Sequence, residues 1–145
     1  MVETLLISAC LVGYNCKYNG GNNALPPEVL AALRERYRLI PVCPEAAGGL
    51  PTPRVPSERR GDSVVTRDGR DVTAAFRRGA EIAGKLAEQT GARLALLKSN
   101  SPSCGSGTVY DGSFTGTLTP GDGVTAEYLK HKNLTLFDNY SSLLA

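Results

Sequence analysis

Residues 4–10, TLLISAC, form a short run of apolar and small side chains that ends in a cysteine. An uncharged run of this length predicts a buried β-strand. Three more runs of the same kind follow at residues 38–43 (RLIPVC), 92–98 (ARLALLK) and 134–138 (LTLFD). We expect these four segments to build the central sheet of the protein.

Helical patterns separate the four strands and cover residues 26–37, 71–91 and 123–133. The longest of them has Asp71 as its expected N-cap and Gly91 as its C′ residue. Its apolar face comprises Val72, Phe76, Ala80, Ala83 and Ala87. Strands that alternate with helices predict an α/β fold with right-handed crossovers. We therefore expect one domain over residues 1–145, with an open, mainly parallel, Rossmann-like sheet of about four strands and flanking helices.

Length and composition are ordinary for a soluble globular chain. The chain has 145 residues, of which 41% are hydrophobic and 21% charged, and its net charge is +2. This charge favours neither nucleic acid nor a membrane as partner, and no apolar run approaches the roughly 20 residues that span a bilayer. The amino-terminal apolar run lacks a basic region before it, so it predicts a strand and not a signal peptide. We expect a cytoplasmic location, where cysteines stay reduced.

Three of the four cysteines follow strands of the predicted sheet. Cys10 ends the first strand, Cys43 ends the second, and Cys104 lies six residues beyond the third in the loop SNSPSCGSG. Because parallel strands end at the same edge, we expect these thiols to meet at the carboxyl edge, where open α/β sheets bind ligands. Cys16 lies in a loop rich in Gly and Asn that can return to this edge.

Converging thiols have several chemical uses, and the residues alone leave them open. A cysteine can be a small buried side chain, as Cys10 next to Ser8 and Ala9 suggests. Zinc sites and thiol–disulfide exchange usually use C-x-x-C pairs, which are absent from this sequence. An iron–sulfur cluster takes thiolates that the fold brings together. If only three cysteines reach a cubane cluster, one iron is left open as a Lewis acid for a soft ligand.

Several motifs together resemble the iron–sulfur-dependent thiouracil desulfidase family, formerly a domain of unknown function. These are SACLVGYNCKYNGG, PVCPEAAGGLPTPR, DVTAAFRRGA, LLKSNSPSCGSGTVYDGSFTG and GDGVTAEYL, which span nearly the whole chain. The resemblance implies a cytosolic enzyme with a 4Fe–4S cluster bound by Cys10, Cys43 and Cys104. The implied reaction is the non-redox desulfuration of 2- or 4-thiouracil to uracil and sulfide at the open iron, with a small thiopyrimidine as substrate.

Two polar residues are candidates for the catalytic groups of this reaction. Glu45 follows Cys43 by two residues, and an anionic cluster and partial burial would help it to act as the base that activates water. Its alternative roles are a helix N-cap or an ion pair with Arg54. Ser101 precedes Cys104 by three residues and can pass a proton to a ring nitrogen or orient the pyrimidine. The alternative for Ser101 is a turn, since Ser before Pro commonly begins one.

Other functions remain as alternatives. A sulfur transferase acting on a nucleoside or on tRNA would use the same open iron, although a dedicated RNA enzyme is expected to have a basic surface. A zinc-bound, non-catalytic domain would use all four cysteines, and a redox carrier would close every position of the cluster with protein ligands. The segment 54–62, RVPSERRGD, is interpreted as a solvated loop or a mobile lid.

Overall fold

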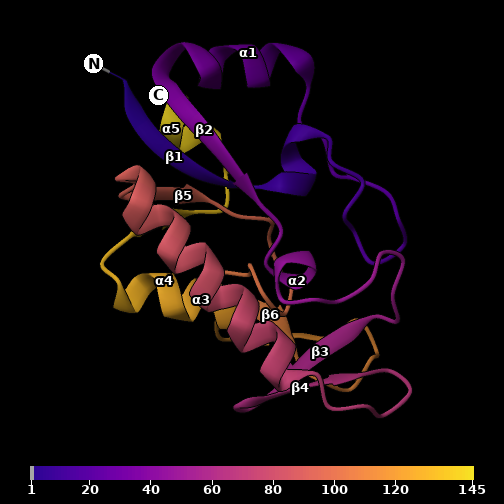
Figure 1. The fold of residues 1–145 in the computed structure, drawn as a ribbon. Coiled ribbons are helices and arrows are strands. Elements are labelled where there is room, and N and C mark those ends of the chain that lie inside the picture. Colours follow the sequence, from indigo (N-terminus) through magenta and orange to yellow (C-terminus); the bar gives the residue numbers. More distant parts are fainter. Residues whose placement is uncertain (1) are drawn as a thin grey trace.

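The computed structural model describes residues 2–145 and is an α/β protein built on a four-stranded parallel sheet (Figure 1). The strand order is β2-β1-β5-β8. The strands are β1 (Glu3–Ser8), β2 (Tyr37–Val42), β5 (Leu94–Leu96) and β8 (Thr135–Phe137). The predicted fold class is confirmed, and each strand begins and ends within two residues of its apolar run.

Helices cover both faces of this sheet. The longer helices α3 (Thr73–Thr90) and α4 (Val124–His131) pack on one face, and α1 (Pro27–Arg36) and α5 (Ser141–Leu144) pack on the other. Strand β1 contributes side chains to both cores. Its buried residues are Leu6 on the side of α3 and α4, and Leu5 and Ile7 on the side of α1. Burial on both faces explains why the parallel strands are continuous apolar runs without alternation.

Of the two predicted cap residues of helix α3, the structure confirms the one at the carboxyl end. Gly91 is the C-cap with φ 74°, as expected for a residue in the left-handed region. The predicted N-cap Asp71 is wrong by one position, because Val72 occupies it. The Asp71 carboxylate still accepts a hydrogen bond from the N–H of Thr73 at 2.9 Å. Asp71 therefore satisfies one of the free N–H groups of the first helical turn, from the position before the N-cap.

Two antiparallel hairpins lie outside the main sheet and were not predicted. The first pairs β3 (Ser57–Arg60) with β4 (Ser63–Thr66), and the second pairs β6 (Thr108–Tyr110) with β7 (Leu118–Pro120). The interpretation of residues 54–62 as a loop or lid is therefore wrong for residues 57–60, which form a strand. In Figure 1 both hairpins lie beyond the carboxyl ends of the sheet strands, on the side of α2.

The short helix α2 (Pro44–Ala47) follows β2 directly and is fixed by close contact with α3. A Cβ on Gly79 of α3 would lie 1.9 Å from the carbonyl oxygen of Pro44. A Cβ on Gly48 would lie 2.0 Å from the carbonyl oxygen of Ala75. The two glycines let the backbones touch, and this contact sets the position of the chain that follows Cys43.

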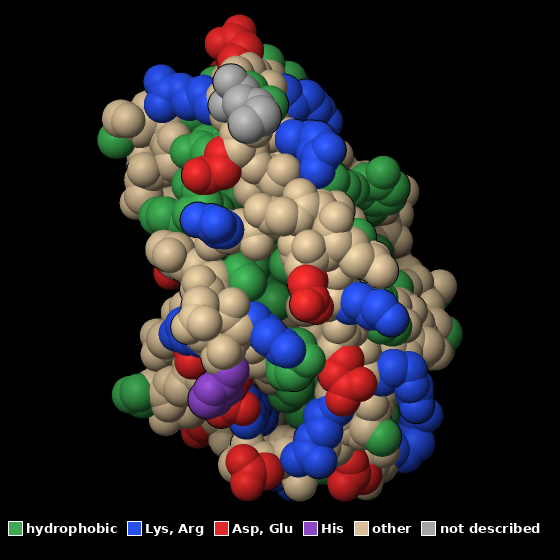
Figure 2. All heavy atoms as spheres, turned by 60° about the vertical axis from the view of Figure 1, so that its left-hand side comes forward, with side chains coloured by type: hydrophobic (Ala, Val, Ile, Leu, Met, Phe, Trp, Pro, Cys, Tyr) green, Lys and Arg blue, Asp and Glu red, His purple; other side chains and the backbone are tan. Residues whose placement is uncertain are grey.

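The surface has no dominant sign of charge on the face that Figure 2 shows, where Lys and Arg side chains are interspersed with Asp and Glu. Across residues 2–145, none of the helices combines the length and apolar character needed to cross a bilayer.

Candidate functional site

All four cysteines line one cavity of about 520 Å³ at the carboxyl edge of the sheet. Cys10 lies in the 3-10 turn η1 (Ala9–Val12) after β1, Cys43 lies between β2 and α2, and Cys104 lies in the loop after β5. Strands β2, β1 and β5 are neighbours in the sheet, so the segments that follow them are also neighbours. The structure thus brings together the three thiols that the sequence placed at strand ends, although the strands themselves stop before each cysteine.

Hydrogen-bond donors surround two of the sulfur atoms. The Ser8 hydroxyl donates to Cys104 Sγ at 3.5 Å, and the Ser103 hydroxyl donates to the same sulfur at 3.6 Å. The Asn23 amide donates to Cys10 Sγ at 3.6 Å. Donors of this kind stabilise negative charge on sulfur and tune the properties of an iron–sulfur cluster.

Burial raises the pKa of the Cys10 and Cys104 thiols, which favours their protonated forms. Burial raises the pKa of Cys104 to about 12, against the opposing effect of the hydrogen bonds from Ser8 and Ser103. The pKa of Cys10 is also raised, first by burial, and the Asn23 hydrogen bond opposes this change. A metal that replaces these protons compensates for the desolvation of the thiolates.

The loop that carries Cys104 is clamped by the amino end of helix α4. The N–H of Val124 donates to the Pro102 carbonyl at 2.8 Å, and the N–H groups of Thr125 and Ala126 donate to the Ser103 carbonyl at 2.8 and 3.0 Å. These groups have no partner within their own helix, so the loop carbonyls satisfy them.

Glycines allow this close approach. A Cβ on Gly123 would lie 2.5 Å from the Ser103 carbonyl carbon, and one on Gly105 would lie 2.8 Å from the Ser101 carbonyl oxygen. Gly107 has φ 84°. The glycines after Cys104 therefore serve the turn itself, and the turn holds the cysteine in place.

Glu45 lies on the cavity wall with both carboxylate oxygens engaged. Oε1 forms an ion pair with Arg54 Nε at 3.0 Å, between side chains that are 15% and 7% exposed. Oε2 accepts a hydrogen bond from the Ser103 hydroxyl at 3.0 Å. The ion pair that the sequence left as an alternative is thus present, and it orients the carboxylate beside the cavity.

Ser101 also forms the turn that was its alternative role. Its Oγ accepts the N–H of Cys104 at 2.7 Å and lies 3.3 Å from Ser103 Oγ. Because the oxygen acts as the acceptor in the first contact, the hydroxyl hydrogen can donate either to Ser103 Oγ or to a bound ligand. Ser101 lines the cavity, so this donor is available to a bound ring.

Arg54 links two loops of the site and was named from the sequence only as a partner of Glu45. One of its terminal nitrogens, Nη2, donates to the Cys16 carbonyl at 2.9 Å, while Nε binds Glu45. The Cys43 thiol donates to the same Cys16 carbonyl at 3.7 Å. Burial and the neighbouring Cys43 raise the pKa of Cys16 to about 12. Cys16 therefore joins the thiol group of the site, in a loop that Arg54 holds.

Sequence reasoning missed four polar residues around the cysteines. They are Ser8, Asn23, Ser103 and Glu58, all of which line the cavity. Ser8 and Ser103 each lie within two residues of a cysteine, which was the available signal. Asn23 and Glu58 come from loop and hairpin segments whose approach depends on tertiary packing. Lys98 is half-buried on the same wall.

The donor set fits an iron–sulfur cluster better than a single zinc ion. Within residues 2–145, no three His, Cys, Asp or Glu side chains are grouped as the ligands of one metal ion would be. The thiols instead border a cavity large enough for a cofactor and a small ligand. Thiols with hydrogen-bond donors around them are typical of cluster sites.

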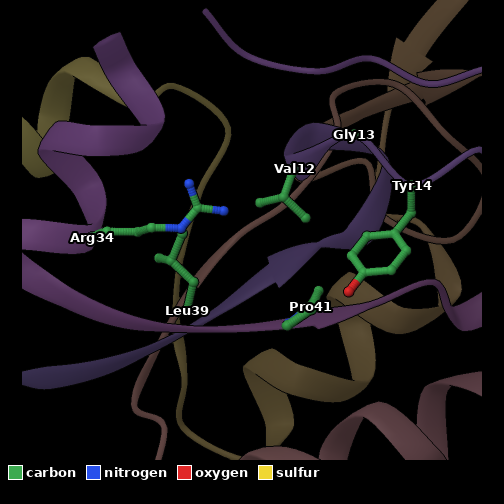
Figure 3. A pocket seen from close by; sticks show the side chains of 6 residues that line it. All are labelled: Val12, Gly13, Tyr14, Arg34, Leu39 and Pro41. Carbon is green, nitrogen blue, oxygen red and sulfur yellow. The ribbon is translucent and has the colours of Figure 1, made fainter. Parts of the chain in front are cut away.

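A second hollow, of about 400 Å³, lies at the open edge of the sheet beside β2. Figure 3 shows Leu39 and Pro41 of β2, the Arg34 side chain from α1, and Tyr14 and Val12 around it. Its lining has no thiol, carboxylate or imidazole, so it lacks the groups that catalysis or metal binding needs.

Fold and site define an α/β protein with a cysteine-lined cavity at the carboxyl edge of its sheet. The profile of the family described as 2-thiouracil desulfurase matches residues 5–140. The chain belongs to this family.

Two similar proteins support the assignment. The chain is 40% identical over 136 residues to the uncharacterized protein YbbK of Bacillus subtilis (strain 168), covering 87% of this chain and 89% of the relative. It is 47% identical to the solved structure of the [4Fe-4S]-dependent thiouracil desulfidase TudS, with a TM-score of 0.89, 93% of this chain covered and 89% of that chain.

Proposed function

We propose that this protein removes sulfur from a thiouracil, giving uracil and sulfide without net redox change, with a 4Fe–4S cluster bound by Cys10, Cys43 and Cys104. The observation that carries the proposal is the convergence of three thiols from adjacent strand ends on one cavity. Membership of the family and similarity to TudS support it. Cys16 is left out of the ligand set, so the cluster keeps one position for the substrate.

When bound, such a cluster supplies an iron without a protein ligand, a Lewis acid that takes a thione sulfur and polarises the C=S bond. The protein must then deliver a water molecule to the ring carbon and manage the protons. Replacement of sulfur by the oxygen of water releases sulfide and leaves the oxidation state of the ring unchanged.

Glu45 is the base that takes a proton from this water. The Arg54 and Ser103 contacts hold the carboxylate in one orientation, which reduces the entropy lost on reaching the transition state. Arg54 also neutralises part of the negative charge that a cluster and a carboxylate bring to the same wall. Arg54 is therefore a positioning residue for Glu45.

Ser101 donates a hydrogen bond to the pyrimidine ring. Its oxygen is already fixed by the Cys104 N–H, so the direction of its O–H is restricted to few alternatives. A donor at a ring nitrogen stabilises the charge that develops there while the C–S bond breaks.

The test uses anaerobically purified protein with 2-thiouracil and with 4-thiouracil. We expect about four irons per chain, sulfide release from at least one isomer, and uracil as the product. Glu45→Gln and Ser101→Ala should keep their iron and lose at least tenfold in kcat. Glu81→Gln, which changes an exposed carboxylate on α3, is the matched control and should resemble the wild type. A colourless protein with one zinc, or a fully active Glu45→Gln variant, would contradict the proposal.

A further inference from the structure

Glu58 is a buried carboxylate on the wall of the same cavity and has no part in the reaction proposed above. Glu58 lies in β3 and is 9% exposed. It lines the cavity from the β3–β4 hairpin, whereas the cysteines line it from the loops that follow the sheet strands. Within residues 2–145 it forms no ion pair. A buried charge without a cation is costly, so its hydrogen bonds must account for it.

One oxygen of Glu58 holds the loop between β6 and β7. Oε1 accepts the N–H of Gly112 at 2.9 Å and the N–H of Phe114 at 3.1 Å. Arg60, two residues along the same strand, donates from Nε to the Gly112 carbonyl at 2.7 Å. Strand β3 thus binds both the N–H and the carbonyl group of Gly112.

The loop that is held in this way has an unusual backbone. Phe114 has φ 58°, a left-handed conformation that is strained for a residue other than glycine. The hydrogen bond from its N–H to Glu58 helps to keep that conformation. Phe114 and Tyr110 of the same hairpin both line the cavity, so the loop gives the site an aromatic wall.

The second oxygen of Glu58, Oε2, has no hydrogen-bond partner among residues 2–145. A glutamine would hold the loop equally well through its single carbonyl oxygen, whereas the carboxylate adds a second acceptor. Glu58 lines the cavity in which a nitrogen heterocycle is proposed to bind. Thiouracils carry N–H groups on their rings, and these are the donors that a carboxylate oxygen recognises.

We propose that Glu58 determines substrate specificity, with Oε2 accepting a ring N–H of the thiopyrimidine while Oε1 fixes the aromatic wall beside it. This inference rests on the proposed function. It predicts selection for rings that carry a hydrogen at one particular nitrogen, and rejection of rings methylated there.

The experiment compares the wild-type holoenzyme with Glu58→Gln on three compounds: the preferred thiouracil, its N1-methyl derivative and its N3-methyl derivative. Glutamine keeps the oxygen for the loop and turns the other atom into a donor. We expect a 10- to 100-fold rise in KM, and in the calorimetric Kd for uracil, with kcat little changed. Iron content and the melting temperature should stay at their wild-type values.

The methylated compounds identify the contact. In the wild type, methylation of one nitrogen should weaken binding by a similar factor, and in Glu58→Gln this penalty should shrink, because the hydrogen bond is already lost. Glu81→Gln should leave every value unchanged. Loss of iron in Glu58→Gln would assign Glu58 to the structure of the site and would refute its role in substrate specificity.

The outcomes separate this inference from the function on which it rests. If the wild type releases no sulfide from either isomer, the proposed function fails and the role of Glu58 fails with it. If sulfide is released and neither methylation nor Glu58→Gln changes binding, only the role of Glu58 is refuted, and Oε2 faces water alone.

Discussion

The contact between α2 and α3 gives a prediction that links stability to the site. Gly79→Ala places a Cβ 1.9 Å from the Pro44 carbonyl oxygen and 2.7 Å from its carbon. Both atoms belong to the backbone, so no side chain can rotate out of the way. Helix α2 must move away from α3 by about 1 Å to reach even the closest contacts that a Cβ tolerates.

The cost of this movement follows from two opposing effects. Overpacking of a close-packed contact destabilises a protein by about 1–3 kcal/mol. Alanine in a helix interior recovers about 0.5–1 kcal/mol relative to glycine. We therefore expect a net destabilisation of about 1–2 kcal/mol, which for a chain of this size lowers the melting temperature by roughly 3–8 °C. Because Cys43 and Glu45 flank Pro44, the cluster occupancy should also fall.

The assay is thermal unfolding under anaerobic conditions, together with iron content per chain. Gly84→Ala is the matched control, since it makes the same change in the same helix. Its Cβ would meet the Tyr128 ring at 2.5 Å, and a side chain can yield where a backbone cannot. Gly84→Ala should therefore keep its iron. Wild-type stability and iron content in Gly79→Ala would refute the claim that this glycine sets the position of α2.

Three further predictions concern the thiols and the carboxylate. Cys10→Ser, Cys43→Ser and Cys104→Ser should each lose iron, whereas Cys16→Ser should keep it; iron analysis of the four variants decides, and iron retained in Cys104→Ser would exclude that ligand. Ser103→Ala removes the donor to Glu45 Oε2, so kcat should fall about tenfold at unchanged iron content, and steady-state kinetics with wild-type values would contradict this role. In the metal-free protein Cys104 should react slowly with iodoacetamide at pH 8 and faster as the pH rises, because burial raises the pKa of its thiol to about 12 and only the thiolate reacts; a rate at pH 8 equal to that of the urea-unfolded chain would refute this expectation.

The main sheet was predictable because its strands are buried on both faces. TLLIS in β1 and the runs of β2, β5 and β8 have no polar alternation, and each is followed by a helix or a turn signal. The hairpins were not predictable in the same way. Strand β3 has the sequence SERR, whose charged side chains contact a loop and a cavity, and β6 and β7 have three residues each, too few for a period.

Of the candidate site, the convergence of its cysteines could be predicted from the sequence. Their position after strands, together with the common edge of a parallel sheet, requires no knowledge of side-chain packing. The sequence could not decide which residues contact Glu45. Arg54 lies beyond a Gly- and Pro-rich loop, and the sequence does not define the course of that loop. Glu58 was missed because its surroundings come from residues 112–114, more than fifty positions away, on a hairpin that periodicity does not reveal.

The apolar cores lie between the sheet faces and the helices, and the sulfur-lined hollow lies at one end of the strands. The polypeptide thus has its own source of folding energy, unlike small domains whose folding depends on a bound ion. A cofactor at such a place can be lost and replaced while the cores on the two faces of the sheet still hold the fold together.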